Sequence, residues 1–403
     1  MEFITGGVCA PKGIRAAGVH CGIRKGKVKK DLALIVSDVS ANAAAVYTTN
    51  IVKAAPITVT QQHLADGRAR AVICNSGIAN ACVSDGIEKA RAMCKLTADA
   101  LGISAQDVLV ASTGVIGQSL DLQPIQTGVS MLTAQLSTNG GTDAAQAIMT
   151  TDTVIKECAV RVDIGGKSVC IGAAAKGSGM MNPRLATMLS FITTDARIES
   201  STLHTLLTDA ANLSINRVSI DGDTSTNDML IILANGESGV QVDKNPEHLS
   251  AFTQALNAVC VHLAKLLAKD GEGATKLIEC TVSGAQDRRA AEKAADSIIN
   301  SPLVKSAMFG QDANWGRILC AAGYSGAQFN PDKVSISLRS SAGEIAVCAN
   351  GAGLNFCEKK ALQILQCNEI IIDINLHSGN ACASAWGCDL SYEYVKINGD
   401  YRT

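Results

Sequence analysis

The sequence predicts an α+β fold in which layered sheets are flanked by helices. Its segments are of three kinds: short apolar runs typical of buried strands, alternating segments typical of hairpins, and amphipathic helices. They do not follow a regular strand–helix–strand repeat, which disfavours a Rossmann-like parallel sheet. With 403 residues, 47% of them hydrophobic, the chain can bury one large core or two medium ones.

The strands are predicted from apolar runs that stop at turn residues, and two further segments alternate in polarity around a turn. The runs are 31–38, 45–47, 70–74, 108–112, 188–193, 277–282 and 369–374, and the hairpins are 157–171, around Gly165-Gly166, and 334–348. The clearest helix is 246–269, whose large apolar residues recur every three or four positions. Other helices are expected at about 85–100, 199–213 and 287–300, with a break at 301–305 after the last.

Composition excludes several classes of function. The formal net charge is -2 and aromatic residues are 3% of the chain, which argues against nucleic acid and anionic membranes as partners. The 15 cysteines form no C-x-x-C pair, so core thiols in a reduced compartment are expected rather than a zinc ribbon. The N-terminus lacks the pattern of a signal peptide, and no apolar run approaches the roughly 18 residues of a membrane span. We therefore expect a soluble cytoplasmic protein without a membrane partner.

The segment 176–189 is the first candidate for chemistry. Glycine and proline predict an irregular loop up to Pro183, and a buried strand follows from Met188. Thr187 lies at the junction. Cleavage before it would create an α-amine with a pKa of roughly 7.7–8.0, which can act as the base for the residue's own hydroxyl. Taken alone, the motif fits a loop entering a core strand better than a nucleophile.

Four other positions carry two interpretations each. Thr113-Gly114 ends a strand, where a hydroxyl and a backbone N–H could stabilise an oxyanion or simply close a turn. Thr153 could line a pocket or cap a turn. Lys176 could bind a substrate carboxylate or be solvated. Glu272, between two glycines, could bind an amino group or be a loop charge.

Two segments resemble known binding motifs but lack a residue that the motif requires. Gly165-Gly166-Lys167-Ser168 resembles the end of a phosphate-binding loop, but the position that needs the first glycine is Arg161. The acidic segment 218–228 lacks the terminal Glu of a calcium loop, so a hydrogen-bonded turn beside the site is the better interpretation.

Several segments, taken together, resemble the ornithine acetyltransferase family, the bifunctional glutamate N-acetyltransferases of arginine biosynthesis. They are 112–117, Ala186-Thr187-Met188-Leu189 with its preceding loop, 218–228, 309–317 and the C-terminal residues, and the resemblance extends from Gly6 to Thr403. Four positions depart from the family pattern: Ile78 replaces an Asn, Ile155 replaces a Pro, and Arg184-Leu185 replace a smaller polar residue and Met.

The resemblance implies a fold shared with self-processing aminopeptidases, and autocatalytic cleavage between Ala186 and Thr187. Residues 1–186 would form the α chain, with the oxyanion hole and the substrate loop. Residues 187–403 would form the β chain, with the nucleophile and the C-terminal substrate-binding part, and the two would assemble as α2β2. The roles implied are nucleophile for Thr187, oxyanion hole for Thr113 and Gly114, and substrate binding for Thr153, Lys176, Thr187, Glu272, Asn398 and Thr403.

The implied reaction moves the acetyl group of N2-acetyl-L-ornithine to L-glutamate through acetyl-Thr187, with ping-pong kinetics. It requires no metal and no organic cofactor, and the resemblance allows acetyl-CoA as a further co-substrate. Two alternatives are kept. One is a self-processing aminopeptidase or amidohydrolase of the same fold, which passes the acyl group to water. The other is a protein that binds small amino acids without turnover.

Overall fold

The computed structural model describes residues 1–26, 28–182 and 188–400, and it divides the chain into two compact units. The first unit comprises Met1–Gly177, Arg184–Ile215 and Thr224–Leu263, and the second comprises Ser178–Pro183, Asn216–Asp223 and Ala264–Thr403. Both predicted fragments, 1–186 and 187–403, contribute residues to the first unit. The fragment boundary is therefore not a boundary between the units, and the cleavage stays a prediction.

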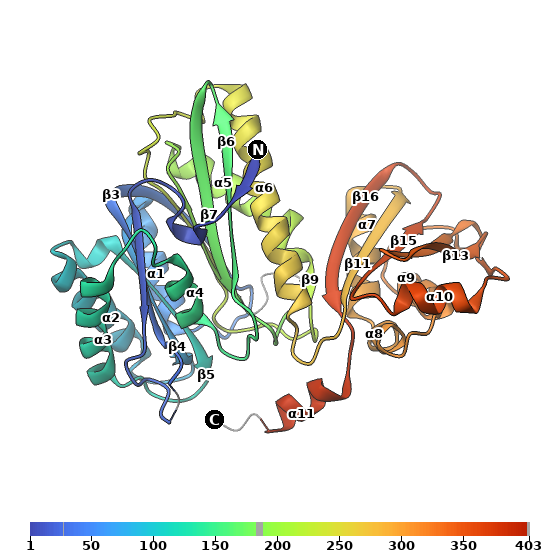
Figure 1. The fold of residues 1–403 in the computed structure, drawn as a ribbon, viewed down its shortest axis with the longest axis horizontal. Helices are drawn as coiled ribbons and strands as arrows, with labels where there is room; N and C mark the ends of the chain where they lie inside the picture. Colours follow the sequence, from blue (N-terminus) through green and yellow to red (C-terminus); the bar gives the residue numbers. More distant parts are fainter. Residues whose placement is uncertain (27, 183–187, 401–403) are drawn as a thin grey trace. The chain divides into compact units, whose positions relative to one another are not determined.

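The first unit is built on a mixed sheet that has nine strands among the described residues, in the order β1-β6-β7-β8-β10-β3-β4-β5 with β2 beside β3 (Figure 1). The pairs β4·β5 and β8·β10 are parallel and the other pairs are antiparallel. The strands are β1 (Glu2–Ile4), β2 (Ile14–Val19), β3 (Leu32–Tyr47), β4 (Arg68–Ile78), β5 (Val108–Val115), β6 (Lys156–Ile164), β7 (Lys167–Lys176), β8 (Leu189–Thr194) and β10 (Met229–Ala234).

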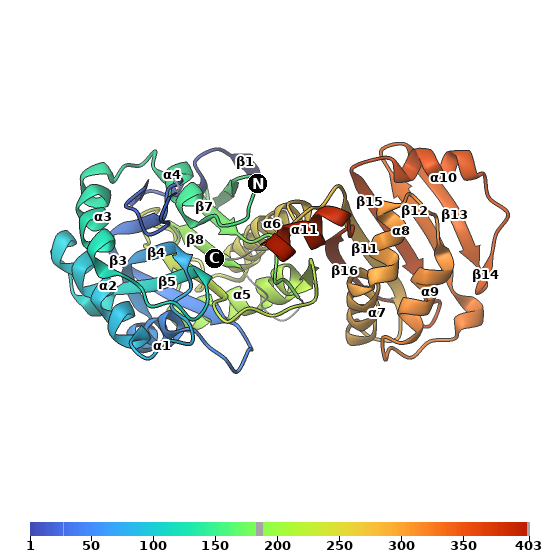
Figure 2. The same cartoon turned by 90° about the horizontal axis from the view of Figure 1, so that it is seen from below.

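This first sheet is buried on both faces, as β3 shows. Leu32 and Leu34 belong to one apolar cluster and Ala33 and Ile35 to another, because successive side chains of a strand point to opposite faces. The first cluster includes residues of α1 (Ala55–His63), α2 (Gly86–Leu101) and α3 (Leu122–Gln135), which lie beside β3–β5 in Figure 2. The second cluster includes residues of α4 (Gly141–Ile148). Burial on both faces explains why these strands read as continuous apolar runs.

Two further helices follow, and the second of them contributes residues to both units. α5 (Ser200–Leu213) packs against β3, and α6 (Pro246–Lys269) spans the residues that the sequence predicts. By length and composition alone α6 could cross a membrane. Half of its most apolar window is buried within the protein, however, and Phe252, Leu256 and Val259 are fully covered. Its hydropathy is therefore explained by its place in a protein core.

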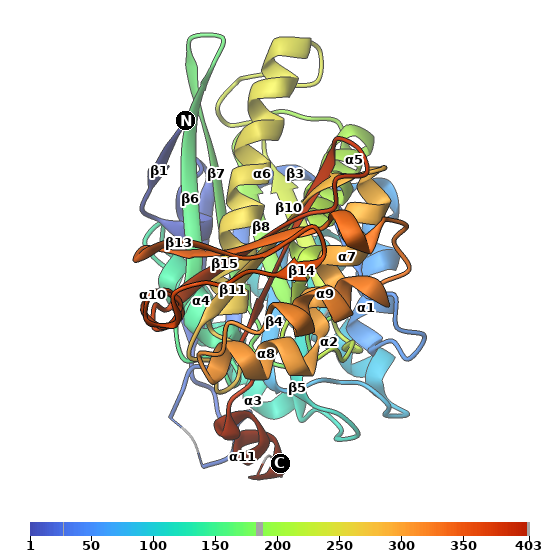
Figure 3. The same cartoon turned by 90° about the vertical axis from the view of Figure 1, so that its right-hand side faces the viewer.

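The second unit has a sheet of seven strands within the described part of the chain, in the order β14-β13-β12-β15-β11-β16-β9. The strands are β9 (Val218–Ser219), β11 (Leu277–Ala285), β12 (Ser335–Ser340), β13 (Gly343–Ala349), β14 (Ala352–Gly353), β15 (Glu369–Asn375) and β16 (Ala381–Cys388). The helices are α7 (Arg288–Asn300), α8 (Pro302–Phe309), α9 (Trp315–Gly323), α10 (Glu358–Leu365) and α11 (Tyr392–Asp400). Figure 3 shows the sheet nearly edge-on, with α7, α8 and α9 on one side of it.

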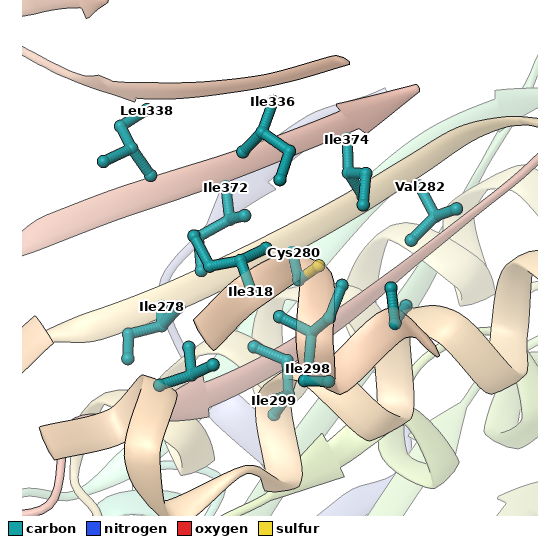
Figure 4. Packing of buried hydrophobic residues seen from close by; sticks show 14 of the residues in the cluster. Ile278, Cys280, Val282, Ile298, Ile299, Ile318, Ile336, Leu338, Ile372 and Ile374 are labelled. Atoms are coloured by element: carbon teal, nitrogen blue, oxygen red, sulfur yellow. The ribbon is translucent and has the colours of Figure 1, made fainter. Parts of the chain in front are cut away.

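The core of the second unit lies on that helical side. Figure 4 shows Ile278 and Val282 of β11 and Ile372 of β15 facing Ile298 of α7 and Ile318 of α9. The residues that alternate with them are more polar, such as Glu279, Thr281 and Asp373. A sheet with one apolar face gives this alternation.

The structure confirms the α+β class with layered sheets and flanking helices, and it confirms both hairpins: β6–β7 and β12–β13. The predicted break at 301–305 is wrong, because α8 begins there. Ser301 caps this helix by accepting a hydrogen bond from the Val304 N–H, and Pro302 occupies the first turn, where its missing N–H costs nothing. Near the C-terminus, α11 continues to Asp400, so the predicted site residue Asn398 lies on a helix.

Candidate functional site

The predicted oxyanion residues lie at the end of a pair of parallel strands. In the register of β4 and β5, Thr113 is opposite Ser76 and Gly114 is opposite Gly77. Gly114 has a φ of 130°, and a Cβ at this position would overlap the backbone of Gly77. Only glycine can therefore occupy position 114, because the conformation and the close approach both exclude a side chain. The structure thus gives a physical reason for the Thr-Gly pair at this strand end.

Lys176 is brought to Thr113 from a different strand. It is the last residue of β7, its side chain is buried, and its Nζ lies 3.4 Å from Thr113 Oγ1. This hydrogen bond is longer than the usual 2.7–3.2 Å for a nitrogen donor, as is common at catalytic sites without substrate. Two predicted site residues, 63 positions apart in the sequence, therefore meet in the first unit.

A buried ion pair that sequence analysis missed lies next to Lys176. Lys156 Nζ is 2.6 Å from Asp152 Oδ1, and both side chains have 0% exposure. The same Oδ1 accepts the Gly177 N–H at 2.7 Å, and Oδ2 accepts the Thr150 N–H at 2.9 Å. The only signal in the sequence was an Asp and a Lys four residues apart at the start of an apolar strand, which is also typical of a solvated turn.

Burial and neighbouring charges shift the pKa values of this cluster. Burial lowers the pKa of the Lys176 ammonium, and the charges of Asp152 and Asp228 oppose that shift. Burial alone would raise the pKa of Asp152, but Lys176 and Lys156 hold it well below its usual value. Asp152 is therefore a stable buried anion that can balance the cations on either side.

Asp228 is a second buried carboxyl group, beside the first described residue after position 187. Its Oδ1 accepts the Met188 N–H at 2.9 Å, while its Oδ2 is buried and has no hydrogen-bond partner among the residues that the structure describes. Burial raises the pKa of Asp228 well above its usual value. Asn227 next to it donates from Nδ2 to the carbonyl oxygens of Ala79 and Ser112, at 2.6 and 2.8 Å. This end of the segment 218–228 is therefore a hydrogen-bonded turn beside Met188, as the sequence suggested.

Two other predicted residues meet within the second unit. Asn398 Nδ2 donates to Glu272 Oε2 at 2.8 Å, although 126 positions separate them. The Glu272 N–H donates to the Ser178 carbonyl oxygen at 2.7 Å, which ties the glutamate to the start of the loop that follows Gly177. Tyr394, on the same helix as Asn398, has its hydroxyl 3.3 Å from Asp221 Oδ2.

Four predicted residues remain, of which the structure describes one. Thr153 is exposed on the turn that leads into β6, next in sequence to the buried Asp152. Ala186, Thr187 and Thr403 lie outside the described residues. Across the described ranges, no group of three or more His, Cys, Asp or Glu side chains is arranged to hold a metal ion.

Comparison with known proteins places this chain in a family. The model of the ArgJ family matches residues 15–403. The arginine biosynthesis bifunctional protein ArgJ of Symbiobacterium thermophilum is 50% identical over 406 aligned residues, which cover 100% of both chains.

Two solved structures are also similar. One is the arginine biosynthesis bifunctional protein ArgJ of Bacillus halodurans, at 44% identity and a TM-score of 0.51, covering 53% of this chain and 100% of that one. The other is the ornithine acetyltransferase of Mycobacterium tuberculosis in complex with ornithine, at 40% identity and a TM-score of 0.42, covering 46% and 98%. On the family match and the full-length identity, the chain belongs to the ArgJ family.

Proposed function

We propose that this protein transfers the acetyl group of N2-acetyl-L-ornithine to L-glutamate through an acetyl-Thr187 intermediate, releasing ornithine and N-acetylglutamate. Membership of the ArgJ family makes it an acyltransferase of arginine biosynthesis. The observation that carries the proposed chemistry is the Thr113 hydroxyl, which lies next to Gly114 and within hydrogen-bond distance of a buried cation, Lys176. Such a site suits a negative charge that develops on a carbonyl oxygen.

In the proposed first half-reaction, the free amine of Thr187 takes the proton of its own hydroxyl, and Oγ attacks the acetyl carbonyl carbon. The tetrahedral oxyanion accepts hydrogen bonds from the Thr113 hydroxyl and the Gly114 N–H. As the intermediate collapses, the amide C–N bond breaks and the amine of ornithine leaves with a proton returned from the Thr187 ammonium. In the second half-reaction, the amine of glutamate attacks the carbonyl carbon of acetyl-Thr187 and gives up a proton to the Thr187 amine; the ester C–O bond then breaks as that proton passes to Oγ and restores the free hydroxyl.

The amine of Thr187 requires cleavage after Ala186. One observation supports this step. The whole length of the solved Bacillus halodurans chain aligns with 53% of the present chain, which is about 214 of its 403 residues. The predicted fragment 187–403 has 217 residues (403 − 186). The related protein thus includes a chain of nearly the length that cleavage here would leave.

We assign substrate binding to the other predicted residues by their chemistry. Glu272, with its carboxylate already hydrogen-bonded to Asn398, suits an amino group of ornithine or glutamate. Thr153, Lys176 and Thr403 complete the proposed set. The proposal also includes association of the fragments as α2β2, a cytoplasmic location, acetyl-CoA as a second donor, and catalysis without a metal or an organic cofactor.

Intact mass and a denaturing gel on purified wild-type protein and Thr187→Ala would test the nucleophile. We expect wild type to appear as fragments of 186 and 217 residues, and Thr187→Ala to stay uncut and inactive. Thr205→Ala, at an exposed helical hydroxyl, is the control and should be cleaved and active. With N-acetylornithine alone, wild type should gain the mass of one acetyl group on the fragment that starts at Thr187.

Steady-state kinetics then separate the alternatives. Parallel lines in double-reciprocal plots are expected for the ping-pong scheme. Sequential kinetics without a trapped acetyl group on Thr187 would contradict the proposal. Acyl transfer to water at the same rate with and without glutamate would favour the aminopeptidase or amidohydrolase, and ligand binding that survives in Thr187→Ala while wild type shows no turnover would favour the binding protein.

A further inference from the structure

We propose that Lys176 is a positioning residue of the oxyanion hole, which orients and polarises the Thr113 hydroxyl, and that the buried Asp152–Lys156 pair holds Lys176 in place. This inference rests on the proposed function, because it assigns a role within the same acetyl transfer. It adds a second role to the substrate binding proposed for Lys176, and this second role is exerted through the Thr113 hydroxyl.

The burial of Lys176 is the first step of the argument. Lysine side chains normally keep their ammonium group in water, because removing a charge from water is costly. Lys176 is 3% exposed at the end of β7, and among the described residues the hydrogen bond of its Nζ is to Thr113 Oγ1. A buried cation of this kind needs a hydrogen-bond acceptor or an anion nearby, and the structure has both.

The second step concerns the proton of the hydroxyl. An ammonium group has three donors and no acceptor, so at this contact Lys176 can only donate and Thr113 Oγ1 can only accept. The hydroxyl's own proton must then point elsewhere, and it becomes available to a substrate oxygen. A free threonine hydroxyl can rotate, whereas one that accepts from a cation is both oriented and a stronger donor. The contact therefore prepares Thr113 for an oxyanion before the reaction begins.

The third step concerns the support behind Lys176. Gly177 follows Lys176 directly, and its N–H donates to Asp152 Oδ1, the same atom that binds Lys156 Nζ. Lys156 is also opposite Ala175, the residue before Lys176, in the pairing of β6 with β7. The ion pair thus fixes the backbone on both sides of Lys176. The Asp152 charge also opposes the effect of burial on the pKa of Lys176, which helps the side chain to stay charged.

The two roles for Lys176 predict different kinetics. A lysine that binds the substrate carboxylate stabilises the enzyme–substrate complex as well as the transition state, so its removal should raise KM. A lysine that acts through the Thr113 hydroxyl stabilises mainly the transition state, in which the oxyanion forms, so its removal should lower kcat. In addition, its effect should disappear when position 113 has no hydroxyl to orient.

A double-mutant cycle on the processed enzyme tests this difference, with Lys176→Met, Thr113→Val and the double variant. Because the loss of one oxyanion donor lowers kcat by about 10²–10³, we expect Thr113→Val to fall in this range. Lys176→Met should lower kcat by on the order of tenfold or more, and a rise in KM reports its separate contact with the substrate. In the Thr113→Val background, adding Lys176→Met should change kcat by less than about twofold, because coupled residues are not additive.

Two controls keep the cycle interpretable. In a Thr113→Ser background the hydroxyl remains, so Lys176→Met should cost as much as it does in wild type. Lys95→Met removes a 71% exposed lysine on α2 and should leave kcat and KM unchanged. If Lys176→Met does not fold or is not processed, Lys176→Gln replaces it: its amide can still donate to Thr113 Oγ1 but carries no charge. Its loss of kcat should also vanish in the Thr113→Val background.

The outcomes separate this inference from the proposed function. Independent losses that multiply in the double variant, or a Lys176→Met variant with unchanged kcat, would overturn the positioning role and leave Lys176 with substrate binding alone. If Thr113→Val itself leaves kcat unchanged, the proposed oxyanion hole fails too. If Thr113→Val is slow, and Lys176→Met is slow by itself but adds nothing to Thr113→Val, both are supported.

Discussion

Two ion pairs, one from each unit of this protein, lie in opposite environments. In the first unit, Asp152 and Lys156 form an ion pair at 0% exposure at the start of β6, in a sheet whose strand β3 is covered on both faces. In the second unit, Arg339 and Asp373 pair across the more polar face of a sheet, with side-chain exposures of 46% and 30%. A charge removed from water interacts much more strongly than one screened by it. The comparison teaches that the strength of an ion pair depends on whether water reaches it, so the Asp152–Lys156 pair should act strongly and the Arg339–Asp373 pair weakly.

The covering of each sheet explains this difference. In β3 of the first unit, both alternating sets of side chains are apolar and buried. In β11 of the second unit, only one set is apolar, and Glu279 belongs to the other. A two-sided core can exclude water from a polar site at the end of its strands, whereas a one-sided core leaves its polar face hydrated. The candidate oxyanion site lies in the unit that can keep it dry.

The largest expected effect comes from breaking the buried pair. Asp152→Asn keeps the shape of the side chain but leaves the Lys156 ammonium buried without its counter-charge. Removing one partner of such a pair typically costs about 3–5 kcal/mol in the free energy of unfolding. Denaturant unfolding would measure the loss, and hydrogen exchange should locate it in β6 and β7. A loss below about 1 kcal/mol would mean that the pair is not isolated from water.

The pH dependence of that loss has a defined sign. The folded-state pKa of Asp152 lies below its unfolded value of about 3.9. Its contribution to stability is therefore fully present above about pH 3.9 and is lost as the pH falls through the folded-state pKa. The stability difference between wild type and Asp152→Asn should be largest near neutral pH and should shrink in acid. A difference that grows in acid would contradict this assignment.

A smaller effect is expected from trimming the second unit's core, where two adjacent residues on β15 form a matched pair. Ile372 is fully buried on the helical side of the sheet, whereas Ile371 is half-buried on the other side. Loss of one buried methyl group costs about 0.5–1.5 kcal/mol, so Ile372→Val should lower the unfolding free energy by that amount. Ile371→Val should cost less. Equal costs at the two positions would show that both faces of this sheet are packed alike.

The smallest effect is expected at the exposed pair. Arg339→Gln removes the contact with Asp373, whose carboxylate oxygen lies 3.1 Å from Arg339 Nε. Exposed pairs contribute about 0–1 kcal/mol and are screened by salt. The unfolding free energy should change by no more than this, and the change should diminish further at high salt. A cost as large as that of Asp152→Asn, unaffected by salt, would remove the contrast between the units.

The sequence by itself determined the elements that depend on local periodicity. The range of α6 was predicted from its repeating apolar residues, and the β6–β7 hairpin from alternation around Gly165-Gly166. These predictions succeed because a helix or a hairpin is largely specified by residues a few positions apart. The start of α8 differs from the prediction for a local reason as well: proline usually favours a break, but it is tolerated in the first turn of a helix.

Only the tertiary structure decided which polar residues are buried and which of them meet. Periodicity cannot show that Lys176 reaches Thr113, or that Glu272 bonds Asn398, because strand pairing and chain folding bring together residues far apart in the sequence. Nor can it tell the Asp152–Lys156 pair from an exposed pair with the same spacing, such as Lys95 and Asp99. The difference between these two pairs is the presence of water, and water is excluded only when distant segments pack over the site.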